Sequence, residues 1–293
     1  MKVRFHMKFI QTSKVKLHYV EHGKGDNIVV FIHGNLACVN WMDLVLPHLP
    51  ENIHYFAIDW RGCGQSEKPL PTNNYDNYSM EQHAEDMIEA IVKLGIDQCH
   101  LANHSTGGII CTHMMVMAPK LFNKVLSLDP VGPKGLDLSQ QTELFQNMKN
   151  SRDLTYSVMA TAAPTLFQSQ SLQNGSSPQF ASTTTSQQQE LYNRLIDKAM
   201  TISDGIWLGV PINLTQEYQS GKLREKQKSI IQPHLILWGE YDQWIPKAHL
   251  DEMVDTMPNC TLQVLKGVGH SCNLENPKKL TEIMISYFSE LEV

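Results

Sequence analysis

The most informative local pattern in this sequence is centred on a serine and reads LANHSTGG from Leu101 to Gly108. A strand pattern precedes Ser105 and a helical pattern follows it, so the chain must turn sharply at the serine. Such a turn strains the backbone and lifts the hydroxyl clear of the sheet. A serine hydroxyl held there can act as a nucleophile once a neighbouring base has taken its proton.

The residues around the serine decide whether this turn can form. Small residues two positions before and two positions after the serine would let the strand and the helix approach closely. Gly107 meets this requirement after the serine, whereas Asn103, two positions before it, is bulkier than glycine. Asparagine tolerates unusual backbone angles, so we expect the turn to form. The turn also places the Thr106 N–H at a helix N-terminus, where unpaired donors and the helix dipole stabilise an anion.

The serine turn and four further motifs resemble those of the α/β-hydrolase fold superfamily. The other four are an H-G-x turn after the third strand, a D-x-R-G-x-G-x-S turn after the fourth, an acid loop and a histidine loop. In this sequence they read FIHGN (31–35), DWRGCGQS (59–66), WGEYD (238–242) followed by Pro246, and GVGH (267–270) followed by ENP (275–277). The motifs occur in the family's order and span most of the chain. The chain is therefore similar to esterase-like serine hydrolases that carry a helical cap.

The resemblance implies a catalytic triad of Ser105, Asp242 and His270, in the chain order that this fold uses. His270 would take the serine proton, because the ordinary pKa of histidine lies near working pH. Asp242 would hold the His270 tautomer and stabilise its imidazolium form. The backbone N–H groups of Asn35 and Thr106 would form the oxyanion hole, which binds the negative oxygen of a tetrahedral intermediate.

Asp129 competes with Asp242 for the role of the triad acid. It ends another predicted strand (VLSLDP), and some family members place the acid after that strand. We favour Asp242, which lies in the better-matched loop, and expect Asp129 to cap a turn before Pro130. The alternative for Ser105, an ordinary helix N-cap, is disfavoured by the surrounding pattern.

Other polar residues in these motifs are expected to have structural roles. His33 should brace the oxyanion turn by hydrogen bonding, and His104 should only flank the nucleophile. Asp59 and Arg61 should hold their loop together.

The identity of the nucleophile limits the expected chemistry. Haloalkane dehalogenases and epoxide hydrolases attack carbon with an aspartate, so the similarity to them ends at the fold, although HGN followed by Trp41 resembles the dehalogenase turn. A serine instead forms an acyl-enzyme from an ester, thioester, lactone or amide. We therefore expect a cofactor-free serine esterase, a hydrolase that cleaves a carboxylic ester or related acyl bond of a small hydrophobic molecule.

Other functions remain open at this point. The same fold could serve a C–C bond hydrolase, an acyltransferase, a hydroxynitrile-lyase-like enzyme, or a small-molecule receptor that retains the triad. A pure scaffold is least favoured, because the triad is complete.

Apolar runs that alternate with helical patterns predict an α/β fold with a mostly parallel, twisted sheet flanked by helices. Strands are expected at 15–19, 27–32, 54–59, 99–103, 125–128, 234–238 and 261–265. Helices are expected from Ser79 to Gly95, at 106–117, and from Pro277, with Ser79 and Asn276 as N-caps.

The alternation breaks between the two halves of the chain. We expect residues 1–130 and 231–293 to form the core domain and residues 131–230 to form an inserted helical cap, with helical segments at 144–159 and 191–200. Residues 168–189 are rich in Ser, Thr and Gln, which predicts a mobile loop. Candidate apolar residues for the cap wall of the substrate pocket are Trp207, Leu208 and Val210.

Composition bears on partners and location. A formal net charge of −6 and the absence of a Lys/Arg run argue against nucleic acid as a partner. The N-terminus lacks the apolar region of a secretory signal, and no apolar run is long enough to span a bilayer. The six cysteines form no CxxC pair and read as reduced thiols, and no metal-ligand spacing or phosphate loop occurs. We expect a cytoplasmic protein with a small-molecule acyl substrate.

Overall fold

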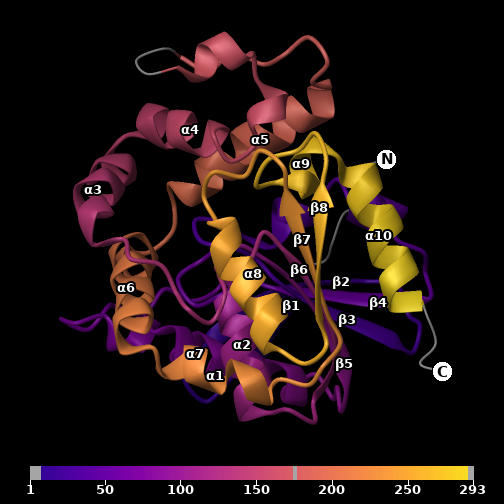
Figure 1. Ribbon diagram of the computed structural model, residues 1–293. Helices are drawn as coiled ribbons and strands as arrows, with labels where there is room; N and C mark the ends of the chain where they lie inside the picture. The colour runs from indigo at the N-terminus through magenta and orange to yellow at the C-terminus, as the bar shows by residue number, and fades with distance from the viewer. Residues whose placement is uncertain (1–7, 174–176, 290–293) are drawn as a thin grey trace.

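A computed structural model of the chain describes residues 8–173 and 177–289 (Figure 1). Its eight strands form one sheet in the order β1-β2-β4-β3-β5-β6-β7-β8. Strands β1 and β2 run antiparallel to their neighbours, and the other six are parallel. The strands are β1 (Lys8–Gln11), β2 (Lys16–His22), β3 (Asn27–Ile32), β4 (Ile53–Ile58), β5 (Cys99–His104), β6 (Phe122–Leu128), β7 (His234–Gly239) and β8 (Cys260–Leu265). The predicted α/β-hydrolase fold with a mostly parallel sheet is confirmed, although β1 was not predicted.

The central strands of the sheet are buried on both faces, which explains apolar runs such as that of β3. In β3, Val30 and Ile32 belong to one hydrophobic core, whereas Val29 and Phe31 belong to a second core on the other face. Successive side chains of a strand point to opposite faces, so a strand covered on both sides favours apolar residues on both faces.

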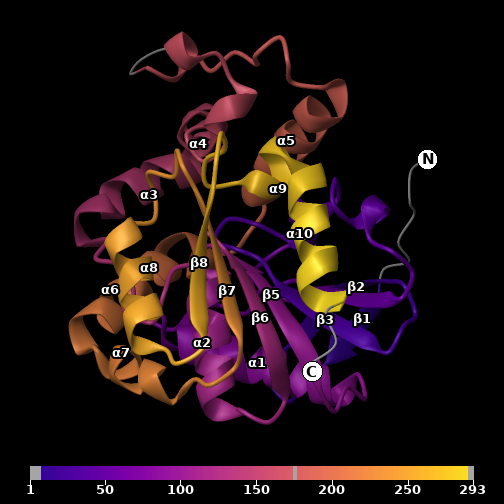
Figure 2. The ribbon, with the colours of Figure 1, turned by 45° about the vertical axis from the view of Figure 1, so that its right-hand side comes forward.

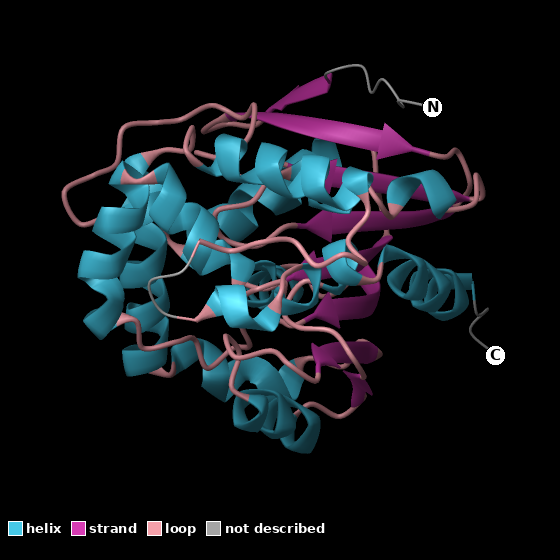
Figure 3. Cartoon of the chain, turned by 90° about the horizontal axis from the view of Figure 1, so that it is seen from above, coloured by secondary structure: helices cyan, strands magenta, loops and turns pink. Residues whose placement is uncertain are grey.

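Helices cover both faces of the sheet (Figures 1 and 2). Helices α1 (Met80–Lys93), α2 (Gly107–Met117) and α8 (Lys247–Thr256) contribute to the first core. The second core is closed by α10 (Pro277–Ser289) and by two 3₁₀ turns that follow β3. Seen from above, the helix that leads to the C-terminus lies across the strands from most of the other helices (Figure 3).

Side chains cap two of the predicted helices as expected. The Ser79 hydroxyl accepts a hydrogen bond from the Gln82 N–H at 3.1 Å at the start of α1. The Asn276 side chain accepts one from the Lys279 N–H at 3.2 Å, and Pro277 is the first residue of α10. Each cap satisfies a donor that the helix itself leaves without a partner.

Among the described residues, five α-helices lie between β6 and β7, within the predicted cap: α3 (Thr142–Asn150), α4 (Arg152–Ala160), α5 (Ser186–Ala199), α6 (Val210–Ser220) and α7 (Lys222–Lys226). Helices α4 and α5 lie beyond the end of the sheet toward which β7 and β8 point (Figure 1). The single helix predicted for 144–159 is two helices, because Ser151 interrupts it and caps α4 through the Leu154 N–H. The division of the chain at residues 130 and 231 stays a prediction.

Residues 168–189 were expected to form a mobile loop, and the structure places ordered turns and part of a helix in their described portion. The Gln168 N–H donates to the Gln179 carbonyl at 2.8 Å, and α5 begins at Ser186. Four aromatic rings hold this region together, those of Tyr156, Phe167, Phe180 and Tyr192. Residues 174–176 lie outside the described part of the chain.

Two further expectations concern the whole chain. None of the helices in the described ranges is long and apolar enough to cross a membrane. All six cysteines are free thiols and all are buried, in agreement with the sequence-based expectation.

The first testable prediction concerns His83 in α1, which should make the fold sensitive to acid. Its ring is fully buried against Trp60, and neither ring nitrogen has a hydrogen-bond partner among the described residues. Burial and the nearby Arg61 cation hold the pKa of His83 well below its ordinary value. In the unfolded chain His83 therefore binds a proton near pH 6.5, whereas in the folded protein it does not. The free energy of unfolding falls as the pH drops below that value.

Urea unfolding of wild type and His83→Leu at pH 7, 6 and 5 measures this effect. Between pH 6 and 5, the free energy of unfolding should fall less steeply in the variant, by up to about 1.4 kcal/mol per pH unit. The same substitution at the exposed His48 serves as the control and should leave the slope unchanged. Equal slopes in wild type and His83→Leu would contradict the prediction.

Candidate active site

The predicted serine turn is present between β5 and α2, and its strain is concentrated at Ser105. The backbone of Ser105 has a φ of 53°, in the left-handed region that residues other than glycine rarely adopt. Two hydrogen bonds hold this conformation: the Ser105 N–H donates to the Leu128 carbonyl at 3.0 Å, and the Val131 N–H donates to the Ser105 carbonyl at 2.8 Å. The end of β6 thus holds the serine in place.

Two glycines bring the turn after β3 against this serine. A Cβ atom on Gly107 would lie 2.3 Å from the Ile32 carbonyl oxygen, and one on Gly34 would lie 2.8 Å from the Ser105 Cβ. Both distances are too short for any side chain, so these positions require glycine. The close approach places the predicted oxyanion residue Asn35 beside the serine.

Asn103, the departure from the family pattern, belongs to the sheet rather than to the strained turn. It lies near the end of β5, opposite Ser127 of β6, and is buried. Its side-chain amide donates to the Ser127 hydroxyl at 2.8 Å, which in turn lies 2.7 Å from His234 Nε2. Burial lowers the pKa of His234 to about 4, so its neutral ring can accept a hydrogen bond from the Ser127 hydroxyl. The larger side chain of Asn103 is therefore accommodated in a chain of hydrogen bonds that runs from β5 through Ser127 of β6 to His234 of β7.

His270 and Asp242 meet beside the serine turn. His270 Nδ1 lies 3.0 Å from Asp242 Oδ2, and both side chains are buried. The other carboxylate oxygen of Asp242 accepts hydrogen bonds from the N–H groups of Trp244 at 2.7 Å and Ile245 at 3.2 Å. Burial would raise the pKa of Asp242, but the neighbouring His270 and these donors bring it below its ordinary value. Asp242 is thus held as an anion.

Asp129 lies next to this pair but does not replace Asp242. Its carboxyl belongs to a group with Asp242 and His270 in which one atom from each lies within 4.8 Å of the others. One Asp129 oxygen accepts the Gly239 N–H at 2.7 Å, and the other has no partner among the described residues. Burial, and then the Asp242 charge, raise the pKa of Asp129 well above its ordinary value. The hydrogen bond to His270 is made by Asp242, the acid that we favoured.

Two aromatic residues confine the His270 ring. The Trp244 indole stacks on it with 5.4 Å between ring centroids and an interplanar angle of 22°. His104 Nε2–H donates to the His270 carbonyl at 2.9 Å. Burial, and then the charge of His270, lower the pKa of His104 to about 3, so it stays neutral. His104 therefore does more than flank the serine. The sequence did not predict that Trp244 contacts His270, although an aromatic residue two positions after the acid was a signal.

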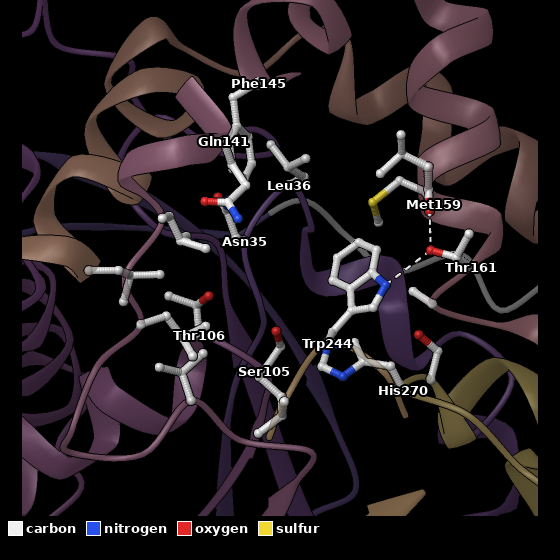
Figure 4. A pocket seen from close by; sticks show the side chains of 18 of the residues that line it. Asn35, Leu36, Ser105, Thr106, Gln141, Phe145, Met159, Thr161, Trp244 and His270 are labelled. Carbon is white, nitrogen blue, oxygen red and sulfur yellow. Dashed lines mark hydrogen bonds between the residues drawn. The ribbon is translucent and has the colours of Figure 1, made fainter. Parts of the chain in front are cut away.

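Asn35 and Thr106, the residues predicted to supply the oxyanion donors, line the same cavity as the serine (Figure 4). Among the hydrogen bonds of the described residues, the backbone N–H groups of Asn35 and Thr106 have no acceptor. Thr106 directly precedes α2, so its N–H belongs to the unpaired donors of a helix start. The role of both amides as oxyanion donors stays a prediction.

The cavity has a volume of about 310 Å³ and is walled mainly by apolar side chains. Ser105 and His270 lie at its base, and Phe145 and Met159 reach it from α3 and α4 (Figure 4). No Asp, Glu, Lys or Arg lines it among the described residues. The other lining residues from the region between β6 and β7 are Val131, Leu136, Leu138, Gln141, Leu144, Met148, Val158, Thr161, Ala162 and Leu214.

The residues suggested for the cap wall were wrong. Trp207 and Val210 are buried in the first hydrophobic core, and Leu208 packs against that core. None of the three lines the cavity. Helical periodicity predicts that apolar residues share one face of a helix. It does not predict whether that face lines a ligand cavity or packs against a neighbouring helix.

The residues expected to be structural are engaged in structural contacts. His33 Nδ1–H donates to the Gly34 carbonyl at 2.8 Å, which braces the oxyanion turn. Asp59 accepts the Val39 N–H at 2.8 Å, and Arg61 pairs with Asp86 at 2.6 Å. These contacts tie the loop after β4 to its surroundings.

Within residues 8–173 and 177–289, the group of Asp129, Asp242 and His270 is the one cluster with the spacing of metal ligands. Most of its ligand atoms are already hydrogen-bonded, whereas the second oxygen of Asp129 has no partner among the described residues. His270 Nδ1 faces Asp242, and each carboxyl group accepts backbone N–H donors. The contacts describe a hydrogen-bonded assembly that orients His270.

The contrast between the two buried carboxyl groups gives a second testable prediction. Asp129 should be protonated at neutral pH, because its pKa is raised well above the ordinary value. Infrared spectroscopy at pH 7 should then show a band of a protonated carboxyl group that disappears in Asp129→Asn. The exposed Asp137 provides the control, and Asp137→Asn should keep the band. A spectrum of Asp129→Asn identical to that of wild type would mean that Asp129 is ionised.

Comparisons with known proteins agree with this architecture. A family model described as the alpha/beta hydrolase fold matches residues 27–277. Epoxide hydrolase 2 of Caenorhabditis elegans is 22% identical over 302 residues, which cover 97% of this chain and 80% of that protein. The monoacylglycerol lipase ABHD6 of Homo sapiens is 24% identical over 266 residues, which cover 90% and 75%. The solved structure of an esterase (EaEST) from Exiguobacterium antarcticum has a TM-score of 0.77 at 22% identity, covering 96% of this chain and 99% of that one. Since the family model spans most of its length, this chain belongs to the alpha/beta hydrolase fold family.

Proposed function

We propose that this protein is a serine hydrolase that cleaves a carboxylic ester, or a related acyl bond such as a thioester or lactone, in a small uncharged molecule. The observation that carries the proposal is the contact between His270 and Asp242 at the base of an apolar cavity that Ser105 also lines. A buried carboxylate that orients a histidine beside a serine in a strained turn is the arrangement that activates a serine for attack on a carbonyl carbon.

The proposed reaction follows from the positions of these groups. Because Nδ1 of His270 faces Asp242, Nε2 is the ring nitrogen available to remove the Ser105 proton. The serine oxygen bonds to the acyl carbon, and the carbonyl oxygen becomes an anion that the Asn35 and Thr106 N–H groups bind. The intermediate collapses, His270 protonates the departing alcohol, and an acyl-enzyme remains. Water then attacks the acyl carbon in the same way and releases the acid and the free serine.

The identity of the residue in the serine turn supports acyl chemistry over epoxide opening. Epoxide hydrolase 2 of Caenorhabditis elegans is a relative at low identity, but this chain carries Ser105 where an attack on an epoxide carbon would require an aspartate. The names of the human lipase and the Exiguobacterium esterase agree with ester cleavage.

The cavity walls support a substrate of limited size without formal charge. A space of about 310 Å³ lined by Leu, Val, Phe and Met side chains favours an aliphatic or aromatic acyl group. A charged group would lose its hydration there without gaining an ion pair. A cytoplasmic location is part of the same proposal, supported by six buried, unoxidised thiols.

The third testable prediction is that a fluorophosphonate probe labels the wild type and not Ser105→Ala. The probe reacts with a serine whose proton can be removed, so labelling reports the activated hydroxyl itself. Ser139→Ala, at an exposed serine, is the matched control and should label like wild type. A folded wild type that neither labels nor hydrolyses any p-nitrophenyl ester would overturn the proposed function.

The fourth prediction separates the two acids by kinetics. Asp242→Asn should lower the kcat for p-nitrophenyl acetate by a factor on the order of 10⁴, because His270 loses its anionic partner. Asp129 makes no hydrogen bond to His270, so Asp129→Asn should change kcat by less than roughly tenfold. The reverse order of the two effects would assign the triad acid to Asp129.

The fifth prediction tests the cavity as the acyl site. Ala162 lines the cavity and is buried, so Ala162→Leu should reduce the space available for an acyl chain. We expect the preferred p-nitrophenyl ester, judged by kcat/KM, to become shorter by one or more methylene groups, each worth about 0.8 kcal/mol of binding. An unchanged chain-length profile would show that the acyl group binds elsewhere.

A further inference from the structure

Glu275 lies at the end of the short helix α9 (Cys272–Glu275), five residues after His270, and its carboxylate joins two separate parts of the chain. One oxygen accepts hydrogen bonds from the Thr165 N–H at 3.0 Å and the Thr165 hydroxyl at 2.7 Å. The other accepts the Gly269 N–H at 2.8 Å and the Ser271 N–H at 3.4 Å. Both residues that flank His270 are therefore bound to one carboxylate.

These four donors satisfy the carboxylate of Glu275, a buried group that would destabilise the fold if it had no hydrogen-bond partners. Burial raises the pKa of Glu275, while the hydrogen bonds from Thr165, Gly269 and Ser271 oppose that change. Among the described residues, no cation forms an ion pair with Glu275. Each donor needs an oxygen lone pair, so an amide in place of the carboxylate could serve only one of the two sides.

A second close approach joins the same two segments. A Cβ atom on Gly269 would lie 2.3 Å from Pro164 Cδ, so the loop before His270 lies directly against the residue that precedes Thr165. Contact this close requires glycine at position 269. Together with the hydrogen bonds between Thr165 and Glu275, it restricts movement of the loop that carries His270.

The same stretch of chain also holds the ring that stacks on His270. Trp244 Nε1–H donates to the Thr161 hydroxyl at 3.0 Å (Figure 4). Thr161 and Ala162 line the cavity, three or four residues before Thr165. The segment 161–165 is thus hydrogen-bonded to the acid loop through Trp244 and to the histidine loop through Glu275.

We propose that Glu275 is a positioning residue for His270. By holding Gly269 and Ser271 on one side and Thr165 on the other, it fixes the imidazole relative to Asp242 and Ser105 and makes its orientation depend on the cavity-lining segment 161–165. The proposal rests on the proposed function for its kinetic consequence, but the orientation of His270 can be measured without turnover.

The test compares Glu275→Gln with Glu240→Gln. Glu240 is a matched control, because it accepts the Gly267 N–H at 3.0 Å in the same loop without contacting a residue next to His270. Proton NMR of histidine-labelled protein follows solvent exchange of the His270 Nδ1 proton, assigned by its loss in His270→Gln. In Glu275→Gln this exchange should become at least about tenfold faster, and the kcat for an ester should fall about 10- to 100-fold, as for a misplaced catalytic group. In Glu240→Gln both should match wild type.

Two outcomes would overturn the proposal. A folded Glu275→Gln variant with wild-type proton exchange and kcat would show that Glu275 does not position His270. If Glu275→Gln does not fold, as judged by thermal unfolding, Thr165→Val and Thr165→Ser replace it, and equal exchange in these two variants would count against the proposal. If the wild type hydrolyses no ester, the proposed function fails, while the exchange of the Nδ1 proton still decides the role of Glu275.

Discussion

The site depends on keeping one negative charge in the protein interior next to a second carboxyl group. Asp129 and Asp242 follow the adjacent strands β6 and β7, and both are buried within reach of His270. Two anions so close together in a medium of low dielectric would repel each other strongly. The surrounding donors resolve this conflict: Trp244, Ile245 and His270 donate to Asp242, whereas Asp129 receives one backbone N–H. The orientation of the histidine follows from this unequal distribution of donors.

The elements most visible in the sequence are those in which backbone geometry restricts residue type. Gly34 and Gly107 must lack a side chain because two backbone segments touch there, and the buried strands must be apolar on both faces. Such local requirements leave a readable pattern, which is why the sheet, the serine turn and the loops carrying Asp242 and His270 could be located without the structure. Asn103 shows that the pattern tolerates change where a neighbouring strand supplies a partner such as Ser127.

The parts that could not be predicted depend on contacts between distant segments. Phe167 and Phe180 are each unremarkable in sequence, yet their rings stack at 4.8 Å and give structure to a stretch whose composition suggested none. The same reason explains why Phe145 reaches the cavity and Trp207 does not: both are apolar residues in helical segments, and only the packing of one helix on another decides which face meets the empty space. Glu275 was visible as part of a motif, but its bond to Thr165 spans 110 residues.

The six buried thiols have a consequence for the chemistry that the protein can withstand. Oxidants and alkylating reagents attack the thiolate form of cysteine, and burial raises the pKa of each of these thiols, for example that of Cys38 to about 12. A native molecule therefore offers such reagents neither access nor the reactive form. Oxidation of these thiols by peroxide would begin with molecules that have opened, so the loss of thiols over time would depend on how often the fold opens.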